Sequence, residues 1–267
     1  MSKERQTILL LTGKNWDGRR EDLFLANYLE RHFSVIISNI EKVESLADKV
    51  DLILIRNIWP TSKKFAQYKE ILSSLSKRNI PYNPGLNLQD LKGKDYLMRL
   101  FKKGFPVIPS IDRKEDIFLL NSPRYYFIKP KHGGSREGCI KISKKQLSEV
   151  DFRKNIAQPF IDFKYEVSFY FIDNKLVYAL YAPNKHNRWV LKPLKIGRKE
   201  KAFAQQFVDW NNLKYGIQRI DAVGTKDNRL LLMEIEDWCP YLSLLDIKKS
   251  LRNKLLKEIV KSIKRRL

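Results

Sequence analysis

The sequence predicts an α/β protein with a small, mostly parallel sheet at its N-terminus and a remainder of the α+β type. Two observations support this fold class. Residues 1–80 alternate short apolar segments of strand length with segments whose apolar residues recur at helical spacing. Beyond residue 150, segments of strand length become more frequent than helical ones.

The N-terminal elements follow a strand–helix rhythm. The segment 51–56 (DLILIR) is a near-continuous apolar run, which is typical of a strand covered on both faces. Further strands are expected at 7–11 and 33–38, helices at 21–31 and 65–75, and a short strand running into a turn at 79–85.

A second unit begins near Gly85. Its helix at 94–103 is followed by Gly104, at the position where glycine commonly ends a helix. Its strands are expected at 107–110, 125–129 and 139–142, with a glycine-containing loop at 132–138. The third unit has strands at 156–161, 165–172, 176–181, 218–223 and 230–236, a polar loop at 184–201, and helices at 202–213 and 247–267. We therefore expect three domains, at 1–84, 85–157 and 158–267.

Length and composition restrict the classes of function. The chain has 267 residues, 43% of them hydrophobic, which indicates a globular protein with a substantial core. Lys and Arg number 52 against 30 Asp and Glu, and the net charge of +22 favours an anionic partner: nucleotide, nucleic acid, acidic protein or membrane surface. The two cysteines, Cys139 and Cys239, exclude a disulfide framework and a cysteine-based zinc site. With no signal-peptide pattern and no transmembrane run, a cytoplasmic protein is expected.

The most informative pattern is a predicted β-hairpin in the C-terminal third. A two-residue turn at 227–228 would pair residues whose numbers sum to 455. In this register, Asp221 lies opposite Glu234. Arg219 lies opposite Glu236.

The same register gives the hairpin a charged face and a core face, because side chains alternate along a strand. The core face is expected to carry Ile220, Ala222, Met233 and Ile235. On the charged face, opposed Cβ atoms are about 5 Å apart, so three carboxylates there repel one another. A hard divalent cation such as Mg²⁺ or Mn²⁺ resolves this repulsion, and the arginine suits a phosphate. The alternative is a solvated polar face that the arginine neutralises.

Other residues are suited to a nucleotide. Lys129 ends an apolar strand, Lys94 opens a helix, and the loop 133–138 offers backbone N–H groups to phosphates. The backbone of 158–161 could address an adenine edge, and Glu166 could accept ribose hydroxyls. Taken singly, each lysine is better explained as a solvated surface residue.

Together and in this order, these residues resemble the ATP-grasp superfamily of carboxylate–amine ligases over nearly the whole chain. The similarity is to the glutathione-synthetase and ribosomal-protein-glutamylating branch, and to bacterial members similar to cycloserine-pathway ligases. The stretches that carry it are 55–59, 83–84, 93–97, 104–109, 128–130, 158–160, 166–168, and the Arg-x-Asp and Glu-x-Glu motifs at 219–221 and 234–236. Two positions depart from the family pattern: Glu236, where Asn is frequent, and Tyr165, where a glycine precedes the glutamate.

The resemblance implies an ATP-grasp fold, in which a Rossmann-like N-terminal domain precedes two α+β subdomains that clamp ATP. It also implies residue roles. Lys94 and Lys129 would contact the α- and β-phosphates, Gly133, Gly134 and Ser135 would cover the triphosphate, Gln158, Pro159, Phe160 and Ile161 would bind adenine, and Glu166 would bind ribose. Asp221, Glu234 and Glu236 would hold Mg²⁺ or Mn²⁺, while Arg219 and Lys129 would act on the transferred phosphoryl group.

The activity implied is an ATP-dependent ligation through an acyl phosphate, with release of ADP and phosphate. The acceptor would be an amine or, less often, a thiol. Arg56 and Arg188 are candidates for gripping an acidic substrate, with surface arginines as the alternative. The carboxylate would belong to a small molecule or a peptide, and a homodimer is compatible with similar ligases.

A rival function follows from the charge. The segment 248–267 is a basic amphipathic helix, whose apolar stripe either packs on the core or docks on RNA, an acidic partner or anionic lipid. The alternative reading is therefore a basic protein that binds nucleic acid or an acidic partner and does not use ligase chemistry.

Overall fold

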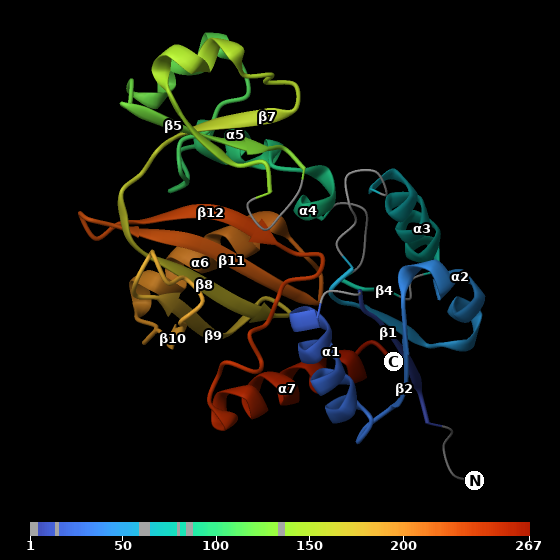
Figure 1. The fold of residues 1–267 in the computed structure, drawn as a ribbon. Coiled ribbons are helices and arrows are strands. Elements are labelled where there is room, and N and C mark those ends of the chain that lie inside the picture. The colour runs from blue at the N-terminus through green and yellow to red at the C-terminus, as the bar shows by residue number, and fades with distance from the viewer. Residues whose placement is uncertain (1–4, 14–15, 59–64, 79–80, 84–87, 133–136) are drawn as a thin grey trace.

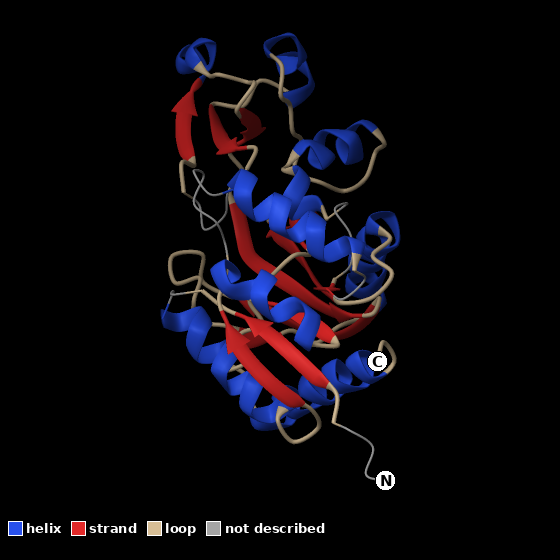
Figure 2. Cartoon of the chain, turned by 90° about the vertical axis from the view of Figure 1, so that its right-hand side faces the viewer, coloured by secondary structure: helices blue, strands red, loops and turns tan. Residues whose placement is uncertain are grey.

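Three β-sheets organise the molecule, and each is built mainly from one stretch of the chain (Figures 1 and 2). They are seen in a computed structural model that describes residues 1–267 except 1–4, 14–15, 59–64, 79–80, 84–87 and 133–136. The α/β class with a parallel N-terminal sheet is confirmed.

The N-terminal sheet has the strand order β2-β1-β3-β4, and its strand pairs are parallel. Its strands are β1 (Thr7–Leu11), β2 (Ser34–Ser38), β3 (Leu52–Ile55) and β4 (Pro81–Tyr82), and its helices are α1 (Trp16–Leu29), α2 (Val43–Leu46) and α3 (Phe65–Lys77). Ile8 and Leu10 face one hydrophobic core, whereas Leu9 and Leu11 face another. This explains the continuous apolar runs, because both faces of the sheet are covered.

The central part contains α4 (Gln89–Lys92), α5 (Asp95–Lys102) and an antiparallel sheet in the order β6-β5-β7. The strands are β5 (Tyr125–Pro130), β6 (Ile140–Ser143) and β7 (Asn155–Pro159). One face packs on a small core of its own through Tyr126, Ile128, Ile142 and Ala157. The other face bears Lys129 and is directed toward the C-terminal sheet.

The strand predicted at 107–110 is not present as such. Val107 forms an isolated bridge with Leu232, and Ile111 forms one with Ala157. The segment therefore connects the edge of one sheet to the edge of another. A short run of apolar residues in the sequence does not show whether the segment is a strand of one sheet or a link between two sheets.

The C-terminal sheet has the order β10-β9-β8-β11-β12 and is antiparallel. Its elements are β8 (Phe163–Ile172), β9 (Lys175–Ala182), β10 (Lys192–Pro193), α6 (Arg198–Asn211), β11 (Ile217–Thr225) and β12 (Leu230–Glu236). The polar loop predicted at 184–201 thus includes a short strand and the first turn of α6. The core face of the sheet packs against α6 through Phe169, Ile220, Phe203 and Phe207.

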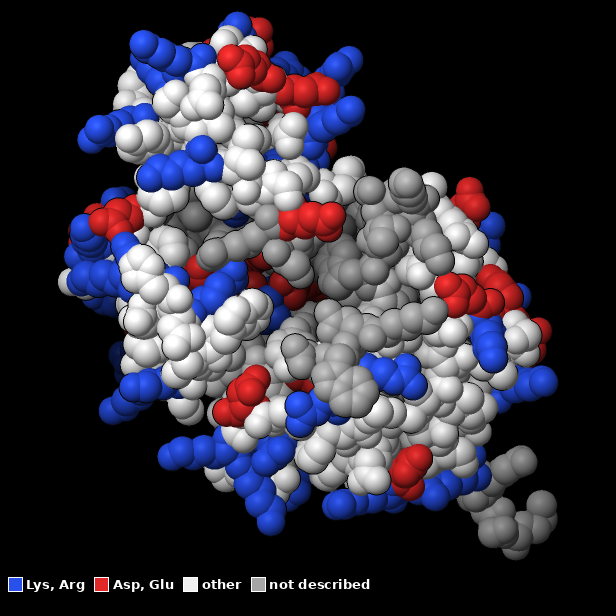
Figure 3. All heavy atoms as spheres, viewed as in Figure 1, with Lys and Arg blue, Asp and Glu red and all other residues white. Residues whose placement is uncertain are grey.

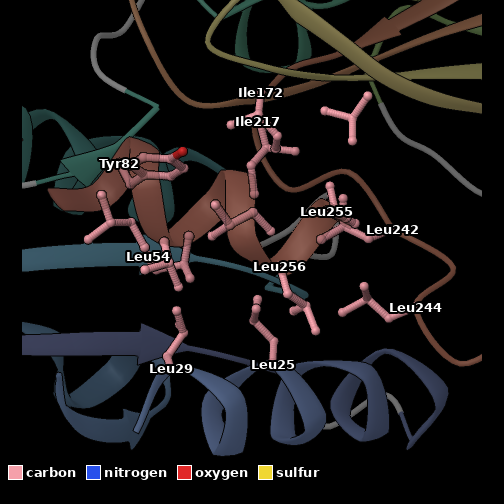
Figure 4. Packing of buried hydrophobic residues seen from close by; sticks show 14 of the residues in the cluster. Leu25, Leu29, Leu54, Tyr82, Ile172, Ile217, Leu242, Leu244, Leu255 and Leu256 are labelled. Carbon is pink, nitrogen blue, oxygen red and sulfur yellow. The ribbon is translucent and has the colours of Figure 1, made fainter. Parts of the chain in front are cut away.

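The basic C-terminal helix α7 (Lys249–Lys264) packs on the core through its apolar stripe. Figure 4 shows α7 beside α1, with Leu256 directed toward Leu25 and with Ile172 and Ile217 of the C-terminal sheet on the other side of α7. The stripe is therefore not available to dock on a partner. Within the described ranges, no helix has both the length and the apolar character that crossing a membrane requires.

Candidate active site

The predicted hairpin is formed by β11 and β12, and its register is the expected one at the charged residues. Arg219 is paired with Glu236, and Asp221 with Glu234. One carboxylate oxygen from each of Asp221, Glu234 and Glu236 lies within 4.8 Å of the others. We call these three residues the acidic cluster.

The turn of this hairpin differs from the predicted one. The Thr225 N–H donates to the Arg229 carbonyl at 2.9 Å, and the Asn228 N–H donates to the Thr225 carbonyl at 3.1 Å. The loop therefore has three residues, 226–228, and Asn228 has a left-handed φ of 61°. Asn adopts this conformation at low cost, so a longer loop than expected is tolerated.

A bulge in β12 restores the expected register. Near the turn, Ala222 is paired with Leu232, one residue out of step with the pairing of Asp221 and Glu234. The additional residue is Met233. Leu232 is fully buried in the core while Met233 is partly exposed, which corrects the predicted core face. A bulge at this place increases the local twist and is common beside functional sites.

Arg219 holds two members of the acidic cluster. Its Nε and Nη2 donate to Oδ1 and Oδ2 of Asp221, both at 2.8 Å, and Nη2 also contacts Glu236 Oε1 at 2.5 Å. Its Nη1 donates to the Tyr241 carbonyl at 2.9 Å. Burial lowers the pKa of Arg219, but the charges of Asp221 and Glu236 raise it well above its ordinary value. The guanidinium is therefore a permanent, oriented charge.

The acidic cluster fits a hard divalent cation. Three carboxylates face one guanidinium, so acidic groups outnumber the basic one in this group of described residues. Among the described residues, the Glu234 carboxylate has no hydrogen-bond or ion-pair partner of its own. The donors are all oxygens at mutual distances that one cation can span, and this donor set is preferred by Mg²⁺ and Mn²⁺.

The predicted phosphate-binding lysines lie on neighbouring segments. Lys129 lies on β5 and is buried, with its Nζ 5.7 Å from the ring centroid of Phe127. Lys94 is the N-cap residue of α5, and its N–H donates to the Lys131 carbonyl at 2.9 Å, which ties the start of α5 to the end of β5. The predicted lid residues Gly133, Gly134 and Ser135 lie outside the described residues.

The predicted adenine segment follows β7. The Gln158 side chain is buried and donates to Ser110 Oγ at 2.8 Å. The Phe160 N–H donates to the Tyr125 carbonyl at 2.9 Å, so it is used within the sheet. Pro159 has no N–H, and the Ile161 N–H makes no backbone hydrogen bond to another described residue. Ile161 is therefore the donor of this segment that a base edge could use.

Lys141 is an exposed residue beside that segment, and it contacts two aromatic rings there. The sequence patterns did not predict this contact. Its Nζ lies 4.1 Å from the Phe160 ring centroid and 4.2 Å from that of Tyr125. The contact joins β6 to β5 and to the residue that follows β7, so no local signal in the sequence could indicate it.

Glu166 and Arg188 contact each other. Glu166 lies on β8, on the same face as Asp221, and its Oε2 is 3.1 Å from Arg188 Nη2. The Arg188 guanidinium also lies 5.2 Å from the ring centroid of Trp189, which is 77% exposed. Arg188 is thus beside the residue predicted to bind ribose.

Arg56 has a different place from the one expected of a substrate-gripping residue. It is buried, and its guanidinium donates to Glu21 at 2.8 Å, to Asp22 at 3.1 Å and to the Pro240 carbonyl at 2.7 Å. It lies at the end of β3, where the polar groups of α1 and of the chain after β12 meet. Since all its nitrogens have internal partners, we do not assign it to substrate.

The two acidic residues beside Arg56 have raised pKa values. Burial raises the pKa of Glu21 to about 7, although Arg56 and the N–H groups of Leu242 and Leu244 act in the opposite direction. Burial likewise raises the pKa of Asp22. The sequence predicted neither residue as part of a polar cluster, because both lie inside a helical pattern.

Figure 3 shows a hollow between the lobe that contains the β5–β7 sheet and the rest of the molecule. Acidic side chains are visible inside the hollow, and basic side chains lie beside them, above the hollow and to its left. Basic side chains next to an acidic floor are an arrangement that attracts a polyphosphate and a cation together.

Comparison of the sequence with protein families and with curated proteins finds no match. No model of a protein family matches the sequence. No curated protein matches it.

Solved structures match nearly the whole chain. The D-cycloserine synthetase DcsG is 15% identical, with 96% of this chain and 98% of that chain covered and a TM-score of 0.76. The macrocyclase MdnC, bound with precursor peptide MdnA from Microcystis aeruginosa MRC, is 11% identical, with 96% and 100% covered and a TM-score of 0.70. The ATP-grasp ligase PsnB, complexed with a phosphomimetic variant of minimal precursor, Mg and ADP, is 12% identical, with 98% and 99% covered and a TM-score of 0.67. This chain has the ATP-grasp fold.

Proposed function

We propose that this protein is an ATP-dependent ligase that joins a carboxylate to an amine, or to a thiol, and releases ADP and phosphate. The observation that supports this most is the acidic cluster with Arg219 at its edge, on a fold similar to that of known ATP-grasp ligases. The three segments 1–84, 85–157 and 158–267 would act as the domains that enclose the nucleotide.

Each predicted residue would have a role that its place permits. Lys94 and Lys129 would bind the α- and β-phosphates, since they come from two segments that a hydrogen bond joins. Gly133, Gly134 and Ser135 would cover the triphosphate. Ile161 would address adenine, and Glu166 would accept the ribose hydroxyls in place of Arg188.

Asp221, Glu234 and Glu236 would hold Mg²⁺. Bound there, the cation would neutralise phosphate oxygens and polarise the transferred phosphoryl group. Arg219 would face the same group, and its fixed fork would bind oxygens whose negative charge grows as phosphoryl transfer proceeds.

The reaction would have two steps. A substrate carboxylate oxygen attacks the γ-phosphorus, the bond from phosphorus to the bridging β,γ-oxygen breaks, and ADP leaves. The amine nitrogen then attacks the acyl carbon, loses a proton, and expels phosphate. Water would compete in the second step, which is why the cleft in Figure 3 needs to close around the acyl phosphate.

The substrate class is proposed from two sources. The net charge of +22 and the basic side chains beside the hollow in Figure 3 favour an acidic carboxylate, and Arg188 is a cationic group next to Glu166. The names of the matching structures include both a small-molecule synthetase and enzymes bound with peptides. We therefore propose a carboxylate on a small molecule or on an acidic peptide.

An acyl-phosphate trap tests this function. The protein is incubated with ATP, Mg²⁺ and a panel of acidic amino acids and peptides, in the presence of hydroxylamine. A ligase gives ADP release that depends on one class of carboxylate and forms the matching hydroxamate. Arg219→Met serves as the inactive control. Nucleotide binding without ADP release for any carboxylate in the panel would contradict the proposed reaction.

A further inference from the structure

The chain after β12 crosses the interior without regular structure. Residues 237–244 are neither strand nor helix, yet most of them are buried. A buried irregular segment needs partners for its backbone polar groups, because it has no place in a sheet or helix that would supply them. We call this stretch the 237–244 segment.

Side chains of the N-terminal domain hold one side of the 237–244 segment. Arg56 Nη1 donates to the Pro240 carbonyl at 2.7 Å. Glu21 accepts the N–H groups of Leu242 and Leu244, both at 2.8 Å, through its two oxygens. The segment is thus fixed by a buried ion pair whose two members each bind its backbone.

Side chains of the active-site sheet hold the other side. Arg219 Nη1 donates to the Tyr241 carbonyl at 2.9 Å, and the Tyr178 hydroxyl donates to the Leu242 carbonyl at 2.5 Å. The carbonyl bound by Arg56 and the carbonyl bound by Arg219 therefore belong to adjacent residues. Because the two residues are covalently joined, a shift of one carbonyl group is readily passed to the other.

We propose that Arg56 and Glu21 are positioning residues for Arg219, acting through the 237–244 segment. The proposal rests on the proposed function, in which Arg219 faces the γ-phosphoryl group. Loss of the Arg56 contact frees the Pro240 carbonyl and lets the Tyr241 carbonyl move, so Arg219 keeps its carboxylate partners but loses its third anchor. Neither Arg56 nor Glu21 needs to touch the nucleotide.

The specific consequence is selectivity for the γ-phosphoryl group. AMP-PNP carries this group and ADP lacks it, so a displaced Arg219 weakens binding of Mg·AMP-PNP and spares Mg·ADP. A general loss of structure weakens both nucleotides alike. The ratio of the two dissociation constants thus separates positioning from simple stabilisation.

The experiment is a double-mutant cycle of Arg56→Lys and Arg219→Lys, with both dissociation constants measured by calorimetry. Lysine keeps the buried charge but cannot bind Glu21, Asp22 and the Pro240 carbonyl in the geometry of the guanidinium fork. Arg56→Lys is expected to weaken Mg·AMP-PNP roughly fivefold and Mg·ADP less than about twofold, within the usual range for coupled contacts. Added to Arg219→Lys, it is expected to change either constant by less than about twofold.

Two further variants make the test complete. Arg78→Lys is the matched control, because Arg78 also pairs with two acids in the N-terminal domain but is exposed, and it should change neither constant. Glu21→Gln is the second positioning variant, to be used if Arg56→Lys does not fold. Equal weakening of both nucleotides, or full additivity with Arg219→Lys, would overturn the positioning role while leaving the ligase function standing. Absence of nucleotide binding by the wild type would overturn both.

Discussion

Arg219 binds both carboxylate oxygens of Asp221 through parallel hydrogen bonds of 2.8 Å, although the two residues lie on one strand and are separated by only one residue. Side chains at i and i+2 share a face of a strand, and a long fork can therefore fold back onto a short acid. The pair positions the cationic edge of the acidic cluster before any ligand is bound.

The same hairpin contains a matched pair for testing the energetic value of this contact. Asp227 and Arg229 also lie at i and i+2, but both are more than half exposed. Asp221→Asn leaves a buried guanidinium partly unpaired and should lower the free energy of unfolding by about 2–3 kcal/mol. Asp227→Asn should lower it by less than about 1 kcal/mol. Urea denaturation measures both, and equal losses would contradict a buried role for the Arg219 pair.

The role that we propose for Glu166 predicts that binding depends on the ribose hydroxyls. Wild-type protein should bind Mg·ATP more tightly than Mg·2′-deoxyATP, by roughly tenfold, because a charged acceptor loses a hydrogen-bonded partner. Glu166→Gln should reduce this preference to about threefold or less by weakening the acceptor. Competition binding with a fluorescent nucleotide measures the ratio. Lys175→Gln, a change in an exposed cation on β9, is the control. An unchanged preference in Glu166→Gln would remove Glu166 from the ribose site.

Glu21 predicts a dependence of stability on pH. Its pKa is raised by burial from 4.5 to about 7 in the folded protein, so the folded state binds a proton more tightly than the unfolded chain. Its contribution to stability is therefore complete below pH 4.5 and is lost as the pH rises through 7. The loss should be of the order of 2 kcal/mol between pH 5 and 8, estimated from the shift.

Glu21→Gln should remove most of that slope, since the amide does not titrate. Asp22, whose pKa is also raised, would leave a smaller slope of the same sign. Urea midpoints at four pH values measure the difference. If the variant and the wild type showed the same pH profile, Glu21 would not titrate in this range.

The contact between α6 and the C-terminal sheet predicts a strong packing effect. Phe207 is fully buried, with its ring centroid 5.1 Å from that of Phe203 and 5.9 Å from that of Phe105. Phe207→Ala should lower the free energy of unfolding by about 3–5 kcal/mol through lost burial and a cavity. Phe118 is 71% exposed, and Phe118→Ala should cost less than about 0.5 kcal/mol. Comparable losses for the two variants would contradict the assigned core.

Local patterns were sufficient to predict most strands of the three sheets and the face of the hairpin that carries the acidic cluster. The parallel N-terminal sheet follows from alternating strand and helix patterns, and the pairing of Asp221 with Glu234 follows from two adjacent strands. The pairing came out as expected although the loop has three residues, because the bulge at Met233 compensates for the longer loop. A pairing rule that counts from the turn would have failed without that bulge.

The features that the sequence did not predict depend on contacts between distant segments. Arg56 was expected to face a substrate, but its partners come from α1 and from Pro240, which lies 184 positions away. A charged residue that ends a strand has the same pattern whether it is exposed or buried in a polar cluster. Lys141 and the 237–244 segment were missed for the same reason, since their partners lie far away along the chain.

We propose above all that the acidic cluster holds a divalent cation together with a nucleotide. Calorimetric titration of AMP-PNP, with and without Mg²⁺, into the wild type and Glu234→Ala tests this binding. We expect binding that depends on Mg²⁺ and that weakens at least about tenfold in the variant, which loses one of three ligands. Binding that is indifferent to Mg²⁺, or equally tight in Glu234→Ala, would contradict the claim.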